Sequence, residues 1–140
     1  MYKYTKNVKN SLFVYKLGQI PEQLFITNKK FIDNLLQENL TNYQGYKKAV
    51  ENKFKLTRLT PVYIDTQTCF IQTMQINKYD CVLINIKAIL DIKSFENKSE
   101  ITFLDNEKIY VSMQKETIFK KIELAEKIEL FLKTKKGIKL

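Results

Sequence analysis

A basic and aromatic stretch around Gly45 holds the residues of this chain that could do chemistry. Residues 42–58 read NYQGYKKAVENKFKLTR. The side chains that we select there are Tyr43, Gln44, Tyr46, Lys47, Lys48, Lys53, Lys55 and Arg58. Lysine and arginine contact phosphates, and aromatic rings beside them can insert into or stack on nucleic acid. The stretch therefore predicts a nucleic-acid interface, and the alternative is a solvated loop and short helix whose tyrosines lie along the edge of the core.

The charge of the whole chain points to the same class of partner. Lysine and arginine number 24 against 15 aspartates and glutamates, which gives a net charge of +9 at neutral pH. Residues 1–21 contain lysines and no acid, and residues 43–61 contain five cations against Glu51 alone. Such local excess attracts polyanions, and nucleic acid is the commonest polyanion in cells. A chain rich in Lys, Asn and Ile can also reflect an AT-rich genome, and its basic surface then needs no partner.

The residue types that most catalysis needs are absent or scattered. The chain has no histidine, which excludes a histidine base and a histidine-ligated metal. It has no P-loop, no GxSxG elbow and no CxxC motif. The aspartates stand singly at predicted strand ends or turns, where Asp is favoured for local backbone reasons. We therefore expect no enzyme, no cofactor and no metal.

The stretch from residue 80 to residue 113 is the centre of the predicted fold. Its apolar runs are rich in the β-prone residues Ile, Val, Phe and Tyr, and they cover residues 81–86, 88–95, 100–104 and 108–113. Asp105-Asn106 separates the last two runs, and both residues tolerate the left-handed backbone angles of a tight hairpin. We predict a strand, a short turn or helical corner, a second strand and then a hairpin.

Further elements flank this centre and complete an α+β prediction. PVYID (61–65) predicts an edge strand after Thr60-Pro61, because proline lacks the donor that a central strand needs, and residues 69–76 predict the next strand. We expect one antiparallel sheet of about five to seven strands over residues 60–113. Residues 1–27 are a basic, β-prone segment with a small hairpin of 12–17 and 22–27.

One helix is predicted before the sheet and one after it, all within a single domain spanning residues 1–140. Apolar residues at helical spacing predict a first helix over residues 28–41. After the sheet, residues 115–133 predict an amphipathic helix that packs on it, and its apolar positions are Ile118, Ile122, Ala125, Ile128 and Leu132.

The cysteines and the apolar pattern bear on the cellular compartment. Cys69 and Cys81 lie in predicted strands, which suits buried thiols in a reducing compartment, although neighbouring strands could also bring them together as a disulfide. No stretch approaches the roughly 20 apolar residues of a membrane span. The N-terminus lacks the apolar region and cleavage site of a signal peptide. We expect a cytoplasmic protein with no membrane partner.

Five segments carry a resemblance to a known family through their order and spacing. They are NYQGYKKAV (42–50), TPVYID (60–65), CFIQTMQI (69–76), CVLIN (81–85) and SEITFLDNEKIYVSMQ (99–114). Together they resemble the ComK family of competence transcription factors over roughly residues 30–132. The closing strand, hairpin and helix over residues 81–132 are also similar to LytTR-type DNA-binding domains. Both similarities imply double-stranded DNA as the partner.

The ComK resemblance implies a regulator that recognises AT-rich promoter DNA, largely through the minor groove. Minor-groove proteins sense groove width and A·T content with lysine or arginine. The resemblance then implies that phosphates or the groove are contacted by Arg58 and the four lysines of residues 43–58. The part that inserts into the groove would be shaped by Tyr43, Gln44 and Tyr46. Arg58 is the only arginine and the first candidate for the narrow groove.

The sequence leaves several properties of such a regulator open. These are the DNA target sequence, whether the protein activates or represses, whether it forms a homo-oligomer, and whether a proteolytic adaptor of the Clp type acts on it. The alternative function is a protein-interaction module or anti-regulator on the same scaffold. It is favoured by residues 35–42, which lack the family's Cys-Arg-aromatic segment. DNA binding would be supported if residues 43–58 and the N-terminal lysines lay on one face of the molecule. Charge scattered over several faces would argue against it.

Overall fold

The structure is a computed structural model that describes the backbone of residues 1–139 and the side chains of residues 1–134. Over these residues it is α+β, as predicted, with a six-stranded and a three-stranded antiparallel sheet. Residues 60–113 contain six strands, within the predicted five to seven, but these strands are divided equally between the two sheets. The helices are α1 (Asn28–Leu36), α2 (Tyr43–Phe54) and α3 (Lys115–Lys139), with 3-10 turns η1 (Gln37–Asn39) and η2 (Ile86–Ala88).

The six-stranded sheet has the spatial order β3-β2-β1-β6-β5-β4. Its strands are β1 (Tyr2–Val8), β2 (Ser11–Lys16), β3 (Glu22–Leu24), β4 (Val62–Asp65), β5 (Thr68–Gln72) and β6 (Leu83–Asn85). β4 is an edge strand, as predicted. The predicted N-terminal hairpin exists as β2 and β3, but it is not a separate unit, because β1 pairs with β6 and joins it to the main sheet.

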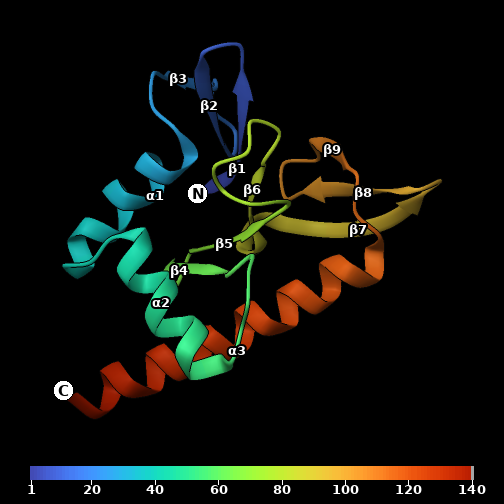
Figure 1. Ribbon diagram of the computed structural model, residues 1–140. Coiled ribbons are helices and arrows are strands. Elements are labelled where there is room, and N and C mark those ends of the chain that lie inside the picture. Colours follow the sequence, from blue (N-terminus) through green and yellow to red (C-terminus); the bar gives the residue numbers. More distant parts are fainter. Residues whose placement is uncertain (140) are drawn as a thin grey trace.

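The single sheet predicted over residues 60–113 is divided in two. At the predicted corner, η2, the chain leaves the six-stranded sheet and then forms β7 (Ile89–Phe95), β8 (Lys98–Phe103) and β9 (Lys108–Val111). The tight turn between β8 and β9 is confirmed: Asn106 has a φ of 72°, and its N–H donates to the Phe103 carbonyl at 2.8 Å. Figure 1 shows the β7–β8 hairpin projecting away from the rest of the molecule.

Helices cover both faces of the six-stranded sheet. On one face, the Phe31 ring of α1 packs edge-on against Tyr2 and Phe70, with centroids 5.6 Å and 6.0 Å away. Cys69 precedes Phe70 in β5 and so points to the opposite face, where α3 lies. Figure 1 shows α1 and α2 to the left of the central sheet, the three-stranded sheet to its right, and α3 running beneath.

The amphipathic pattern predicted for the last helix is confirmed in α3. Ile118, Ala125 and Ile128 are fully buried, while Ile122 and Leu132 pack against the core from partly buried positions. The helix extends from Lys115 to Lys139, beyond the predicted end at residue 133.

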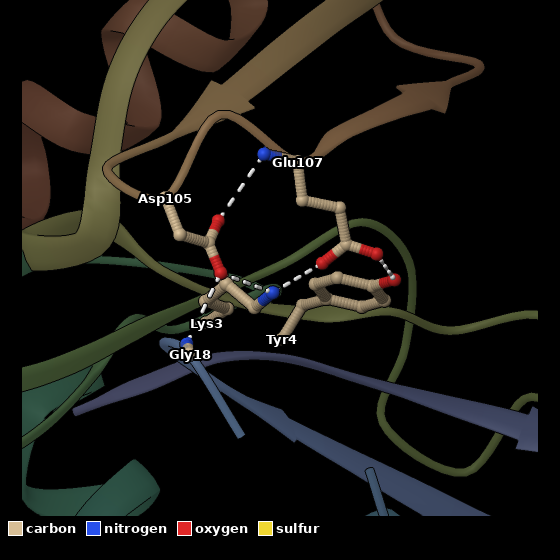
Figure 2. Close-up of polar contacts among 5 residues, drawn as sticks. All are labelled: Lys3, Tyr4, Gly18, Asp105 and Glu107. Carbon is tan, nitrogen blue, oxygen red and sulfur yellow. Dashed lines mark hydrogen bonds and ion pairs between the residues drawn. The ribbon is translucent and has the colours of Figure 1, made fainter. Parts of the chain in front are cut away.

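A buried lysine joins the first strand to the second sheet. The side chain of Lys3 is 6% exposed; its ammonium lies 2.8 Å from Asp105 Oδ2 and also contacts the Glu107 carboxylate. Tyr4 donates to Glu107 Oε2 at 3.1 Å, and the N–H of Gly18 donates to Asp105 Oδ2 at 3.3 Å (Figure 2). Burial alone would lower the pKa of Lys3, but the hydrogen bonds to the two carboxylates raise it. This cluster fixes the β8–β9 turn against β1.

Glu129 ties α3 to the corner between the two sheets and makes stability depend on pH. Its side chain is 7% exposed and lies 2.6 Å from Lys87 Nζ and 3.0 Å from Lys133 Nζ. Burial raises the pKa of Glu129, but the hydrogen bonds from the two lysines outweigh this and lower it. A carboxyl whose pKa is lower in the folded state stabilises the fold above its unfolded pKa of about 4.3. That contribution is lost as the pH falls through the folded pKa.

We expect the Glu129→Gln variant to lose less stability than the unchanged protein as the pH falls below about 5. Urea unfolding at a series of pH values measures this. The matched control is Glu126→Gln on the same helix, an exposed position whose substitution should leave the pH dependence unchanged. A Glu129→Gln variant with the same acid dependence as the unchanged protein would show that this carboxylate is not responsible.

Both cysteines are buried free thiols. Burial, and then the Glu129 carboxylate, raise the pKa of Cys69 to about 12. Since the thiolate is the reactive form, Cys69 should not react with a thiol reagent at neutral pH while the protein stays folded. Labelling followed by peptide mass spectrometry tests this, with urea-unfolded protein as the positive control. Fast labelling of Cys69 in the absence of denaturant would contradict the burial.

Candidate nucleic-acid interface

The basic stretch of the sequence is mostly a regular helix, α2, rather than a loop. Asn42 caps it, because Oδ1 of Asn42 accepts the N–H of Gly45 at 2.8 Å. Glycine suits position 45 because the side chain of Thr41 lies close to it: a Cβ at this position would be 3.2 Å from Thr41 Oγ1. The helix ends at Lys55, whose backbone is left-handed with a φ of 57°.

The two tyrosines predicted to shape an insertion are buried. Tyr43 and Tyr46 are 4% and 8% exposed. The Tyr46 hydroxyl donates to the Pro61 carbonyl at 2.8 Å and accepts the N–H of Tyr63 at 2.9 Å. The Tyr43 hydroxyl accepts from Nε2 of Gln72 at 3.0 Å, and Tyr43 also lines the cleft described next. Burial raises the pKa of both phenols. Their helical spacing with Val50 is the sequence signal for this buried side of α2.

A cleft lies at the end of the sheet where β5 ends and β4 begins. Its volume is about 300 Å³. The charged residues that line it are Lys29, Lys47 and Arg58, and the amide residues are Gln44, Gln72, Gln75 and Asn77. Among the described lining residues none is acidic. The cleft thus presents cations and amide groups to whatever enters it.

The loop that carries Arg58 is anchored at Thr60, on its C-terminal side. The Thr60 hydroxyl donates to Glu51 Oε2 at 2.9 Å, and the Thr60 carbonyl accepts from Nε2 of Gln72 at 2.7 Å. Leu59 has a left-handed φ of 55°, a costly conformation for a residue that is not glycine. Backbone strain of this kind persists only where the surroundings fix it. Arg58 is therefore held at the mouth of the cleft by a defined loop.

The structure brings only part of the predicted site together. Gln44, Lys47 and Arg58 line the cleft. Lys48 and Lys55 are exposed and lie outside its lining. The ammonium of Lys53 lies on the other side of α2, 5.0 Å from the centre of the Phe131 ring of α3.

Lys29, Gln75 and Asn77 are among the cleft residues that were missed from the sequence. They come from the start of α1 and from the loop after β5, far from residues 43–58 in the chain. No spacing in the sequence indicates that these segments meet. Their polar character was the only available signal.

The N-terminal lysines do not share one surface with the cleft. Lys3 is buried among carboxylates, and Lys16 lies 5.2 Å from the centre of the Tyr2 ring. The β1–β2 turn, in contrast, lies at the same end of the sheet as the cleft, because Nδ2 of Asn7 donates to the Tyr79 carbonyl at 2.8 Å. The cations of the N-terminal segment and of residues 43–58 are therefore spread over more than one surface, and only some of them lie at the cleft end of the sheet.

A metal-binding cluster and a membrane-spanning helix are both absent from the described part of the chain. No group of three or more His, Cys, Asp and Glu side chains in it could hold a metal ion. Nor does it contain a helix with the length and apolarity that crossing a membrane requires.

Comparisons with known proteins place the chain in a family. No curated protein and no solved structure matches it. A protein-family model described as ComK protein matches residues 18–137, which include α1, α2, most of α3 and every segment that lines the cleft. The match covers most of the sequence. The chain therefore belongs to the ComK protein family.

Proposed function

We propose that this protein is a cytoplasmic, DNA-binding transcriptional regulator that recognises AT-rich promoter DNA in a competence-type pathway. Membership of the ComK family, a family of transcription factors, supports the class of function. The observation that carries the proposal is the cleft at the end of the sheet, whose charged lining residues are Lys29, Lys47 and Arg58. Lys47 lies 3.5 Å from Glu51 Oε2, whereas Lys29 and Arg58 have no carboxylate within 4.0 Å among the described side chains. DNA binding draws on such cations, because each phosphate contact releases a condensed counterion.

The chemistry of the lining favours the minor groove of A·T pairs. In that groove A·T pairs present only acceptors, N3 of adenine and O2 of thymine. Arg58 and the amide groups of Gln44 and Gln75 are donors that suit these atoms. A guanine adds an amino donor there, which a lysine or arginine cannot accept. A·T tracts also have a narrow minor groove whose negative potential attracts inserted cations.

Fluorescence anisotropy with labelled AT-rich and GC-rich duplexes at several salt concentrations tests the proposal. We expect tighter binding to the AT-rich duplex and a steep loss of affinity as salt rises. Equal binding to both duplexes would contradict AT-rich recognition and leave only attraction to polyanions. No binding to either duplex at low salt would overturn the DNA proposal in favour of a protein-interaction module.

Lys47 and Lys48 form a matched pair for the same titration. Both are on α2, but Lys47 lines the cleft and Lys48 does not. We expect Lys47→Ala to weaken binding to both duplexes and to reduce the salt slope by about 0.9, the value for one phosphate contact. Lys48→Ala should change the slope much less. Equal slopes for the two variants would show that the cleft is not where the DNA backbone is held.

A further inference from the structure

Arg58 and Leu59 separate two hollows at the same end of the sheet. The first is the cleft described above. The second has a volume of about 390 Å³ and lies on the side of the loop that follows β5. The residues that line both hollows are Arg58, Leu59 and Gln75, and Lys78 lines only the second. The shared residues therefore form a wall between two depressions, each with its own lysines.

Three of the four cations around this wall have no ion-pair partner among the described side chains. No described carboxylate lies within 4.0 Å of the charged groups of Lys29, Arg58 or Lys78. The fourth cation, Lys47, lies 3.5 Å from Glu51 Oε2. Burial, and then the Arg58 guanidinium, lower the pKa of Lys121 of α3. An anion beside Arg58 would relieve this repulsion.

We propose that Arg58 and Leu59 form a ridge that enters the minor groove, while the two hollows each receive a separate phosphate of the flanking backbone. Lys29 and Lys47 hold a phosphate in the first hollow, and Lys78 holds another in the second. The shape of duplex DNA suits this arrangement, because a minor groove about 6 Å wide has a phosphate backbone on either side. A ridge between two cationic hollows fits that cross-section. This inference rests on the proposed function and adds Leu59 and Lys78 to the interface.

The loop geometry supports a fixed ridge rather than a mobile arm. The left-handed backbone at Leu59 and the two hydrogen bonds of Thr60 hold the loop at its C-terminal side. A fixed insertion loses less conformational entropy on binding than a flexible one. Gln75 stands in the wall with its amide available on either side.

Single and double lysine substitutions test the two hollows. We would measure the salt slope for an AT-rich duplex with Lys29→Ala, Lys78→Ala and the double variant. Lys78→Ala should reduce the slope by about 0.9, because Lys78 alone holds the second phosphate. Lys29→Ala should reduce it by less, because Lys47 remains beside the first phosphate. The double change should reduce it by the sum of the two single losses, because the two lysines hold different phosphates. Lys55→Ala is the control, since it removes one exposed cation near the same loop but lines neither hollow. Far-ultraviolet circular dichroism checks that each variant is folded.

The outcomes separate this inference from the function on which it rests. Binding of the AT-rich duplex by the unchanged protein, with an unaltered slope in Lys78→Ala, overturns the two-hollow arrangement and leaves the proposed function standing. A double variant whose slope falls by less than the sum of the two single losses also overturns it, because both lysines would then share one phosphate. Failure of the unchanged protein to bind any duplex overturns the proposed function itself.

Discussion

Replacing Asn85 with alanine should lower the free energy of unfolding by about 3–5 kcal/mol. Asn85 is fully buried at the end of β6. Its Oδ1 accepts the N–H of Cys69 at 2.9 Å and that of Lys87 at 3.2 Å. Its Nδ2 donates to the carbonyls of Tyr2 and Gln67, each at 2.9 Å. One side chain thus joins β1, β5 and η2.

The size of this effect follows from what the alanine would leave behind. Four backbone groups would lose their partner, and a buried polar group without a partner costs about 1–3 kcal/mol. Water entering the space of the lost amide would recover part of that cost, which keeps the total below the simple sum. Urea unfolding followed by circular dichroism measures the change.

The control for this prediction is Asn52→Ala on the exposed side of α2. Alanine favours a helix more than asparagine does, so this variant should be neutral or slightly more stable. A loss below about 1 kcal/mol in Asn85→Ala would mean that the four hydrogen bonds do not hold the centre of the sheet. Asn85 would then be an ordinary strand residue.

The second large effect concerns binding: Arg58→Ala should weaken binding to an AT-rich duplex by about 10- to 100-fold and reduce the preference over a GC-rich duplex. Arg58 lies between the two hollows and is the only guanidinium of the chain. Its planar group offers several donors to acceptors in a narrow groove, in addition to its charge. Loss of Arg58 therefore removes both charge and donors.

Two further variants separate the charge of Arg58 from its shape. Arg58→Lys keeps the charge, so the salt slope should hold while the preference for A·T falls, because a lysine lacks the planar donors. Lys55→Ala removes a nearby exposed cation and should leave the preference intact. An unchanged A·T preference in Arg58→Ala would exclude Arg58 as the groove-reading residue. Anisotropy with both duplexes at several salt concentrations measures the slope and the A·T preference of all three variants.

The elements that could be predicted from the sequence are those set by local patterns. The spacing of Ile118, Ala125 and Ile128 predicted α3 and its buried side, because the helical period places them on one face. The β8–β9 turn was predictable because asparagine tolerates the left-handed conformation that Asn106 adopts. Both inferences need only neighbours in the chain.

The elements that were missed depend on contacts between distant segments. β1 was not recognised as a central strand, because a lysine at position 3 is expected at the surface. Its burial depends on the contacts with Asp105 and Glu107, which are distant in the sequence. The division into two sheets depends on the corner that Asn85 fixes.

The candidate site was likewise predictable only in its local pattern. The basic character of residues 43–58 was evident, but the cations of this segment do not act together, because a helix distributes side chains around its axis. Lys47 therefore faces the cleft while Lys53 faces α3. The burial of Tyr43 and Tyr46 could not be predicted with certainty from the sequence, because aromatic residues beside lysines suit a core edge as well as a binding surface.

The position of β1 in the sheet has a consequence for the order in which the chain folds. β1 is synthesised well before β6, yet the two strands pair, with Thr5 opposite Leu83. The centre of the sheet therefore cannot close until residues 83–85 have left the ribosome. The ion pairs of Lys3 form later still, because its partners are Asp105 and Glu107. Contacts between such distant residues slow folding, so β1, β2 and β3 remain an incomplete sheet with an open edge until β6 has been synthesised.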